Sequence, residues 1–210
     1  MSKQAIFTVG ISGSGKSTWA WQHQDEWRVI DRDVIRRTHL ILNVKEYDPS
    51  EDNMWDHWDF ETMEATCNRR REELIEAVLL EGSNVIFADT NLNYKKLEPL
   101  MQQLLREDYS VKFQFFPTTL EDAKYRNACR RDAVPDHLLQ IRYTAYNAFK
   151  GAPIRLDYGD VPFDVILDCM TGEIDSVEIA GIYVGNVLAE HVIMSLRDDI
   201  IELKVMDVRP

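Results

Sequence analysis

The sequence predicts an α/β fold in which a parallel β-sheet is covered by helices on both faces. Two observations lead to this prediction. Short apolar runs alternate with longer segments of helical periodicity over the first 150 residues, and a glycine-rich stretch directly follows the first apolar run, residues 5–9. Alternation of this kind is typical of βαβ units. Because right-handed crossovers bring the carboxyl ends of the strands to one edge, we expect a ligand site at that edge.

The elements follow from local patterns. Apolar runs predict strands over residues 5–10, 27–33, 83–93 and 109–117. Apolar spacing of three to four residues predicts helices over 16–25, 62–80, 95–108, 120–135 and 136–151. Gly82 follows the second of these helices directly, where glycine commonly ends a helix. Each strand is thus followed by helical sequence, as a parallel sheet requires.

The charge distribution divides the chain into two predicted parts, 1–151 and 152–210. The net charge is −12, and most of it lies after residue 150, so the last 60 residues are poorly suited to bind a polyanion. We expect a linker over 152–162, strands over 163–188 and a helix over 189–203, which together make a small acidic α+β segment. Three roles stay open for it: a remnant domain, an oligomerisation piece that gives a homo-oligomer, or a cap over a substrate.

Composition also indicates where the protein works. No apolar run approaches the ~20 residues of a membrane span, and the first residues do not resemble a signal peptide. Cys67, Cys129 and Cys169 lie far apart and show no CxxC spacing. These features favour a cytoplasmic, reducing compartment without membrane contact, and they exclude a disulfide framework.

The stretch GISGSGKS, residues 10–17, fits the pattern G-x-x-x-x-G-K-[ST] at every fixed position. Glycines let the backbone wrap so that its N–H groups face phosphate oxygens, and the following helix adds its N-terminal dipole. Lys16 is expected to reach the β- and γ-phosphates, and Ser17 to ligate Mg²⁺. The pattern therefore predicts an NTP site, and its nucleotide-binding residues are Gly10, Ser12, Gly13, Ser14, Gly15, Lys16, Ser17 and Thr18.

Three aspartates follow predicted strands. Asp31 and Asp33 end the second strand, where a carboxylate can take the proton of an attacking hydroxyl group. The competing interpretation of Asp33 is a helix N-cap. Asp89 ends the apolar run VIFAD, a usual place for an acid that holds magnesium or orients a catalytic group. A turn or capping aspartate is the alternative for Asp89.

Basic and aromatic side chains add further candidates. Arg126 and Arg130 are spaced to share one helix face and to close over an NTP as a lid, although a solvated basic face would show the same spacing. We expect residues 69–71, RRR, to face solvent. The stretch 46–61 has seven acids and no base. Its Trp55 and Trp58 could stack on a base, but packing is the more common role.

Four motifs, in this order along residues 5–150, resemble those of the bacteriophage-type polynucleotide 5′-hydroxyl kinases. They are GSGKSTWA (13–20), DRDVIR (31–36), DTNLN (89–93) and KYRNACRR…AVP (124–135). The resemblance implies a P-loop kinase fold, with Asp33 as general base and Arg36 as the arginine that binds the acceptor phosphate. It also places an essential aspartate at Asp89 and the lid arginines at Arg126 and Arg130.

The implied reaction is transfer of the γ-phosphoryl group of ATP to the 5′-hydroxyl end of DNA or RNA. In that reaction Lys16, Mg²⁺ and the two lid arginines bind the donor, and Asp33 takes the hydroxyl proton during in-line attack. The partners would be an NTP and a nucleic-acid end.

The sequence departs from the family pattern in three respects, one of which is that the segment 151–210 has no recognisable counterpart in the family. The acidic block 46–61 favours a P-loop kinase with a small acceptor, such as a nucleoside, nucleotide or sugar nucleotide. A non-enzymatic NTP-binding switch is a further alternative. The stretch FDVILDCMTGEI (163–174) lacks the D-x-D-G-T motif of the phosphatase that follows the kinase in bifunctional phage enzymes. We therefore predict no 3′-phosphatase activity.

Overall fold

The computed structural model describes residues 3–149, 153–158, 161–166, 177–179, 182–184, 187–189, 191–197 and 200–207. Its helices are α1 (Lys16–Gln22), α2 (Arg32–Asn43), α3 (Met54–His57), α4 (Glu64–Glu81), α5 (Tyr94–Arg106), α6 (Leu120–Ala128) and α7 (Asp136–Phe149). The strands of the first part are β1 (Lys3–Val9), β2 (Arg28–Ile30), β3 (Val85–Phe87) and β4 (Tyr109–Phe115).

These four strands form the parallel sheet that the sequence predicted, and their order is β2-β3-β1-β4. Phe7 of β1 is in register with Phe87 of β3 and Phe113 of β4. The three rings stack across the sheet, with centroids 4.6 Å and 5.7 Å apart. Large apolar side chains on neighbouring strands therefore fix the centre of the sheet.

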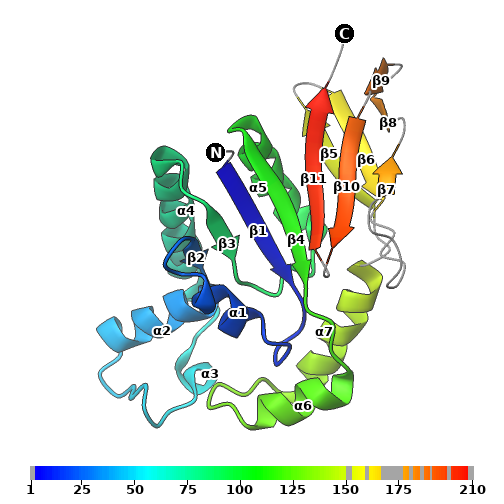
Figure 1. Cartoon of the computed structure of the whole chain (residues 1–210). Helices are drawn as coiled ribbons and strands as arrows, with labels where there is room; N and C mark the ends of the chain where they lie inside the picture. Colours follow the sequence, from blue (N-terminus) through cyan, green and yellow to red (C-terminus); the bar gives the residue numbers. More distant parts are fainter. Residues whose placement is uncertain are drawn as a thin grey trace.

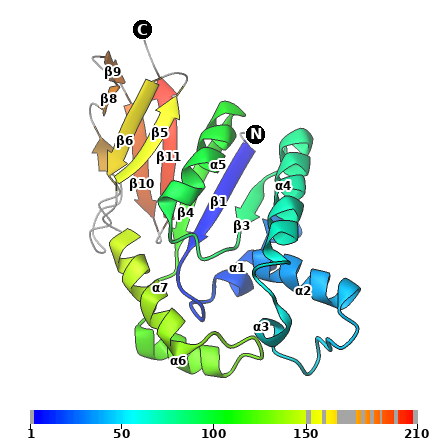
Figure 2. The ribbon, with the colours of Figure 1, turned by 180° about the vertical axis from the view of Figure 1, so that it is seen from behind.

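Helices cover both faces of this sheet. Phe7 and Val9 of β1 belong to the larger core cluster, which takes in side chains of α2, α4 and α5. Ile6, on the opposite face, packs with Ala20 of α1 in a second cluster. Alternation along β1 thus divides the core into two layers. Figures 1 and 2 show α4 and α5 on one side of the sheet, while α2, α3, α6 and α7 gather at the end toward which β1 points.

The C-terminal part differs from its predicted secondary structure. The expected linker, 152–162, contains β5 (Pro153–Tyr158), which pairs with β6 (Val161–Ile166) in an antiparallel ladder. The expected helix, 189–203, is wrong as well, because β10 (His191–Arg197) and β11 (Ile200–Asp207) form antiparallel strands there. Apolar and polar residues alternate along IELKV, which suits a strand, and β-branched residues favour that choice.

These strands continue the parallel sheet. β11 pairs antiparallel with β4, so that Ile201 lies opposite Phe113, and the full order is β2-β3-β1-β4-β11-β10-β7. β7 (Val177–Ile179) is its last strand, and β8 (Ile182–Val184) pairs with β9 (Val187–Ala189). The division into parts 1–151 and 152–210 stays a prediction. Most of the stretch 163–174, including Asp168 and Cys169, lies outside the described residues.

None of the helices in the described part of the chain is both long and apolar enough to cross a membrane.

Candidate active site

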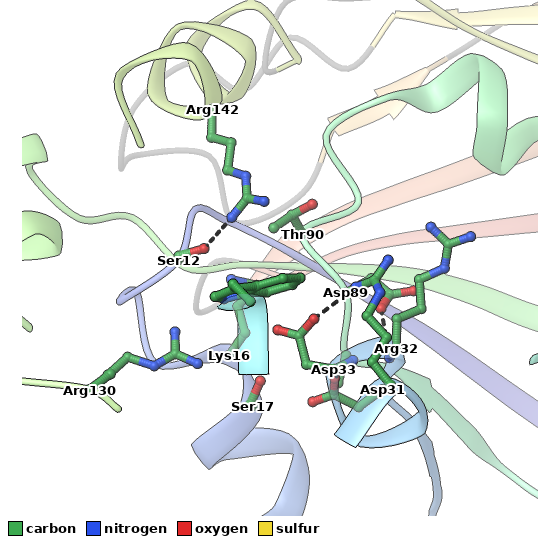
Figure 3. Close-up of a pocket in the computed structure, with 13 residues that line it drawn as sticks. Ser12, Lys16, Ser17, Asp31, Arg32, Asp33, Asp89, Thr90, Arg130 and Arg142 are labelled. Carbon is green, nitrogen blue, oxygen red and sulfur yellow. Dashed lines mark hydrogen bonds and ion pairs between the residues drawn. The ribbon is translucent and has the colours of Figure 1, made fainter. Parts of the chain in front are cut away.

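The carboxyl ends of the parallel strands carry the charged side chains that the sequence singled out. β1 runs into the glycine-rich loop, Asp31 follows β2, and Asp89 follows β3. Figure 3 shows Asp31, Asp33 and Asp89 on one wall of a shared pocket, with Lys16 and Ser17 beside them. Strand order therefore brings together residues that are far apart in the sequence.

The glycine-rich loop has the backbone that its sequence predicts. Gly13 and Gly15 have φ values of 84° and 99°, in the left-handed region where only glycine is unstrained. A Cβ atom at Gly13 would also lie 2.7 Å from the carbonyl oxygen of Ala123 in α6. The loop thus packs directly on α6, and α1 begins at Lys16 with its first N–H groups turned to the loop.

Lys16 is buried in this loop. Its Nζ donates to the carbonyl oxygen of Ile11 at 2.7 Å and lies 3.4 Å from the hydroxyl of Ser14. Burial, which is the largest cause, and the positive charge of Arg130 together lower the pKa of Lys16 to about 7. Near neutral pH the amino group of Lys16 is therefore only partly protonated. An anionic ligand beside it would favour the charged ammonium form.

Asp31 links β2 to the loop. Its carboxylate caps α2 by accepting from the backbone N–H of Asp33 at 2.9 Å, and it also hydrogen-bonds to the side chain of Ser17. Burial, which is the largest cause, and the nearby charges of Asp33 and Asp89 together raise the pKa of Asp31 to about 6. The prediction that Asp33 ends a strand was wrong, because Asp31 supplies the N-cap and Asp33 lies in the first turn of α2.

Asp33 and Arg36 lie one turn apart on α2 and form an ion pair of 2.9 Å between Oδ1 and Nη1. The other edge of the Arg36 guanidinium group donates to Glu64 of α4, from Nη2 at 2.7 Å and from Nε at 3.2 Å. The Arg36 side chain is only 10% exposed, whereas Asp33 is 44% exposed. Arg36 is therefore fixed between two carboxylates, and Asp33 keeps one side open to the pocket.

The acidic block 46–61 turns its aromatic side chains toward Arg36. The rings of Trp55, Trp58 and Phe60 have centroids 5.6 Å, 5.8 Å and 5.9 Å from the guanidinium carbon, within the range of cation–π attraction. Trp58 is buried and donates from its indole N–H to Glu64 at 3.1 Å. Packing is thus the role of Trp58, as expected, and Trp55 also lines the pocket.

Asp89 holds α2 in place. Its Oδ1 accepts from the backbone N–H of Arg32 at 3.1 Å, and its Oδ2 lies 3.5 Å from Nε of Arg71. The prediction that residues 69–71 face solvent was wrong for Arg71, which is 17% exposed and stacks over the ring of Phe87. The reason is a buried carboxylate, Asp89, that draws one arginine of the run inward. Burial raises the pKa of Asp89.

The helix predicted over residues 120–135 is shorter than expected. α6 ends at Ala128, and the following residues form turns, so Arg130 lies beyond the helix that carries Arg126. Asn127 closes this loop, because its side chain donates to the carbonyl oxygen of Val134 at 2.8 Å and accepts from the N–H of Val134 at 3.0 Å. Both arginines nevertheless line one pocket with the glycine-rich loop.

Two pockets meet at the loop. The first, here called the donor-side pocket, is lined by Gly13, Gly15, Lys16, Ser17, Thr18, Arg126 and Arg130. The second, the acceptor-side pocket, contains Ser12, Asp31, Asp33, Arg36, Trp55, Asp89 and Arg142, together with the three residues common to both, Lys16, Ser17 and Arg130. Gly10 and Ser14 belong to the loop but are not among the residues that line these pockets.

Sequence reasoning missed several residues of the site, and Arg142 and Asn91 are two of them. Arg142 of α7 donates from Nη1 to the hydroxyl of Ser12 at 2.6 Å. The buried Asn91, at φ 50°, donates from its side chain to the carbonyl oxygens of Thr8 and Phe87 and so shapes the loop after β3. Asparagine tolerates this backbone better than most residues, which was a usable signal. A single arginine in a helix gives no such signal.

Comparison with known proteins agrees with this geometry. The family model described as AAA domain matches residues 6–145 of the 210. The chain belongs to this family. A protein assigned as a bifunctional polynucleotide kinase/RNA ligase in Autographa californica nuclear polyhedrosis virus is 32% identical over 142 residues. That match covers 64% of this chain but only 19% of the relative, so the chain spans about a fifth of the relative's length. Together these matches assign residues 6–145 of this protein to the AAA-domain family.

A solved structure shares the fold of this protein. A structure of the PezAT chromosomal toxin–antitoxin system of Streptococcus pneumoniae matches with a TM-score of 0.54 and 18% identity, over 76% of this chain and 70% of that chain. The Pnkp1/Rnl/Hen1 RNA repair complex matches with a TM-score of 0.49 and 17% identity, over 86% and 54%. At the identity of the PezAT match, the likeness concerns the fold of this AAA-domain protein and not its substrate.

Proposed function

We propose that this protein transfers the γ-phosphoryl group of ATP to the 5′-hydroxyl end of DNA or RNA. The observation that carries the proposal is the meeting of two pockets at Lys16, Ser17 and Arg130. One pocket is built around the phosphate-binding loop, and the other contains a carboxylate, Asp33, with an open side. A transferred group can pass between them without leaving the protein. The viral relative, which carries polynucleotide kinase in its name, supports the same reaction.

The donor would lie in the donor-side pocket. Backbone N–H groups at the start of α1 and the ammonium group of Lys16 would bind its phosphates. Arg126 and Arg130 would close over them, and Arg130 also reaches the acceptor-side pocket. Arg130 is therefore placed to neutralise charge while the phosphoryl group moves.

Asp33 would act as general base. Its ion pair with Arg36 orients the carboxylate, and its exposed side faces the pocket where an acceptor hydroxyl group would lie. Proton transfer to this carboxylate would accompany in-line attack on the γ-phosphorus. Asp89 would serve as a positioning residue in this scheme, because it holds the start of α2 through the N–H of Arg32.

Ser17 and Asp31 fit a magnesium ion. Their side chains hydrogen-bond to each other beside Lys16, and both offer the oxygen ligands that Mg²⁺ prefers. Mg²⁺ commonly binds through one or two protein oxygens together with substrate phosphates and water. Ser17 and Asp31 would hold the ion, which when bound would neutralise charge on the phosphate oxygens.

A kinase of a small acceptor is the second candidate, and one observation favours it. Aromatic side chains of the acidic block 46–61 surround Arg36, and Glu64 offsets the charge of that arginine. The positive charge available to bind a polyanionic strand is therefore reduced. A nucleoside or nucleotide would need fewer phosphate contacts. A non-enzymatic NTP-binding switch would need no general base.

The test is transfer of labelled γ-phosphate from ATP with Mg²⁺ to two acceptors in parallel. One acceptor is a short 5′-hydroxyl oligonucleotide, and the other is a mixture of nucleosides and nucleotides. We expect label on the oligonucleotide and a loss of about 10²–10⁴ in rate in Asp33→Ala, with ATP binding retained. Label on the small acceptors alone would replace the proposal by the second candidate. If Asp33→Ala is as active as the wild type, both kinase proposals fail, because each needs Asp33 as general base.

A further inference from the structure

The loop that carries Arg130 is exposed but has buried anchors. α6 ends at Ala128 and α7 begins at Asp136, so residues 129–135 connect the two helices. Arg130 is exposed, and among the residues that the structure describes, none forms a hydrogen bond or an ion pair with its side chain. The position of its guanidinium group therefore depends on the backbone of the loop 129–135.

One anchor is Asn127, at the base of the loop. Its carbonyl oxygen accepts from the backbone N–H of Arg130 at 3.0 Å, and its buried side chain bonds to both backbone groups of Val134. These bonds close the loop on the end of α6. They do not connect it to the acceptor-side pocket.

Asp132 makes that connection. Its side chain is 7% exposed, its Oδ1 accepts from the backbone N–H of Met54 at 2.9 Å, and its Oδ2 forms an ion pair with Arg37. The carbonyl oxygen of Asp132 accepts from the indole N–H of Trp55 at 3.4 Å. Figures 1 and 2 show the segment between α6 and α7 extending to α3. α2 and α3 therefore both contact a residue that is two positions from Arg130.

These two helices also carry the walls of the acceptor-side pocket. Asp33 lies on α2, four residues before Arg37, and Trp55 lies on α3. Arg130 lines both pockets. A buried carboxylate is costly unless it is paired and hydrogen-bonded, so the bonds of Asp132 favour one arrangement of the loop against α2 and α3.

We propose that Asp132 is a positioning residue for the transfer reaction. It holds Arg130 where the two pockets meet, at a fixed place relative to Asp33, so that the guanidinium group stabilises charge on the phosphoryl group during attack by the acceptor hydroxyl group. Stabilisation of this kind depends on geometry, and a displacement of about 1 Å can cost about 10²-fold in rate. The inference rests on the proposed function and holds for either class of acceptor. Asp132 itself contacts no substrate in this scheme.

The first measurement is the kinetics of Asp132→Asn. Asparagine keeps the size of the side chain and an oxygen that can accept from Met54, but it removes the charge that pairs with Arg37. Asp136→Asn is the matched control, because Asp136 is 70% exposed and pairs with Lys124 at 3.5 Å, away from the residues that line the two pockets. We expect kcat to fall about 10- to 100-fold in Asp132→Asn, with KM for ATP within about threefold. Asp136→Asn should resemble the wild type.

A double-mutant cycle separates positioning from a general loss of structure. Because Asp132 acts through Arg130, adding Asp132→Asn to Arg130→Ala should lower kcat further by less than about threefold. Arg37→Gln removes the same ion pair from the side of α2, and its kcat should fall as in Asp132→Asn. A full additional loss in the Arg130→Ala background would overturn the proposal, because Asp132 would then act on another part of the protein.

Hydrogen exchange measured by mass spectrometry tests the contact without turnover. We expect the amide of Met54 and those of residues 129–135 to exchange faster in Asp132→Asn, and not in Asp136→Asn. Unchanged exchange, or wild-type kcat in Asp132→Asn, would overturn the role of Asp132 and leave the kinase proposal standing. If the wild type labels neither acceptor, the proposed function has failed, and the positioning role fails with it.

Discussion

The carboxylate of Asp33 and the guanidinium group of Arg36 form an ion pair of 2.9 Å within the first two turns of α2. The proposed base and the arginine that orients it are thus neighbours on one helix face. Glu64 of α4 binds the far edge of the same guanidinium group. The position of the Asp33 side chain therefore depends on α4 as well as on α2.

Arg36 should matter for turnover more than for acceptor binding. In the double variant Arg36→Gln with Glu64→Gln, no unpaired carboxylate is left at Glu64, and Asp33 loses its orienting partner. We expect kcat to fall about 10- to 100-fold even with a nucleoside that carries no phosphate, and KM to change little. Steady-state kinetics with both acceptor types measures this. A rise in KM confined to phosphorylated acceptors would instead show that Arg36 binds the acceptor phosphate.

The two lid arginines should differ in what they contribute. Arg126 lines only the donor-side pocket, whereas Arg130 lines both pockets. Arg130→Ala should therefore lower kcat by about 10²–10³, and Arg126→Ala should show a larger share of its loss in KM for ATP. Rates measured over a range of ATP concentrations separate the two effects. Wild-type turnover in both variants would show that this segment is no lid.

Binding of ATP should take up a proton at mildly alkaline pH. The pKa of Lys16 is lowered to about 7 in the empty loop, and triphosphate charge beside it would raise that pKa. Between the two pKa values the bound state holds the extra proton, so uptake should approach one proton near pH 8 and vanish near pH 6. Calorimetry in buffers of different ionisation enthalpy measures the uptake. Lys16→Met, which cannot titrate, is the control, and equal uptake in that variant would assign the proton elsewhere.

Asp31→Asn should stabilise the ligand-free protein. The pKa of Asp31 rises from 3.8 to about 6 on folding, so the folded state binds the proton more tightly. The stability that this group contributes is therefore lost as pH rises through about 6, and asparagine removes the cost while keeping the N-cap. We expect a gain of about 1–3 kcal/mol in the free energy of unfolding at pH 7, and no gain near pH 4.

Urea denaturation at the two pH values tests this expectation. The same variant should transfer phosphate more slowly, because a carboxylate next to Ser17 is lost from the proposed magnesium site. A loss of stability at pH 7 would mean that Asp31 is needed in its charged form by the empty protein.

Local patterns were enough for much of this protein. The glycine loop, the alternation of strands and helices up to residue 149, and the acids after β2 and β3 all follow from short stretches of sequence. Gly13 and Gly15 adopt the left-handed backbone that the motif requires, and alternation along β1 places Phe7 in the core. These features depend on contacts within a few residues or on the period of one element, so the sequence alone determines them.

Other features depend on which distant segments meet. Arg71 lies close to the buried Asp89, whereas Arg69 and Arg70 are exposed. β11 forms a strand that pairs with the edge of β4. Arg142 donates to Ser12, which lies 130 residues earlier in the sequence. The local sequence around a helical residue does not indicate which cavity its side chain will line. Only packing of α2, α4, α6 and α7 around the ends of the strands decides which carboxylate offsets which arginine. The sequence thus determined the glycine-rich loop and the acids that follow the strands, and the tertiary structure decided how the charges around them are paired.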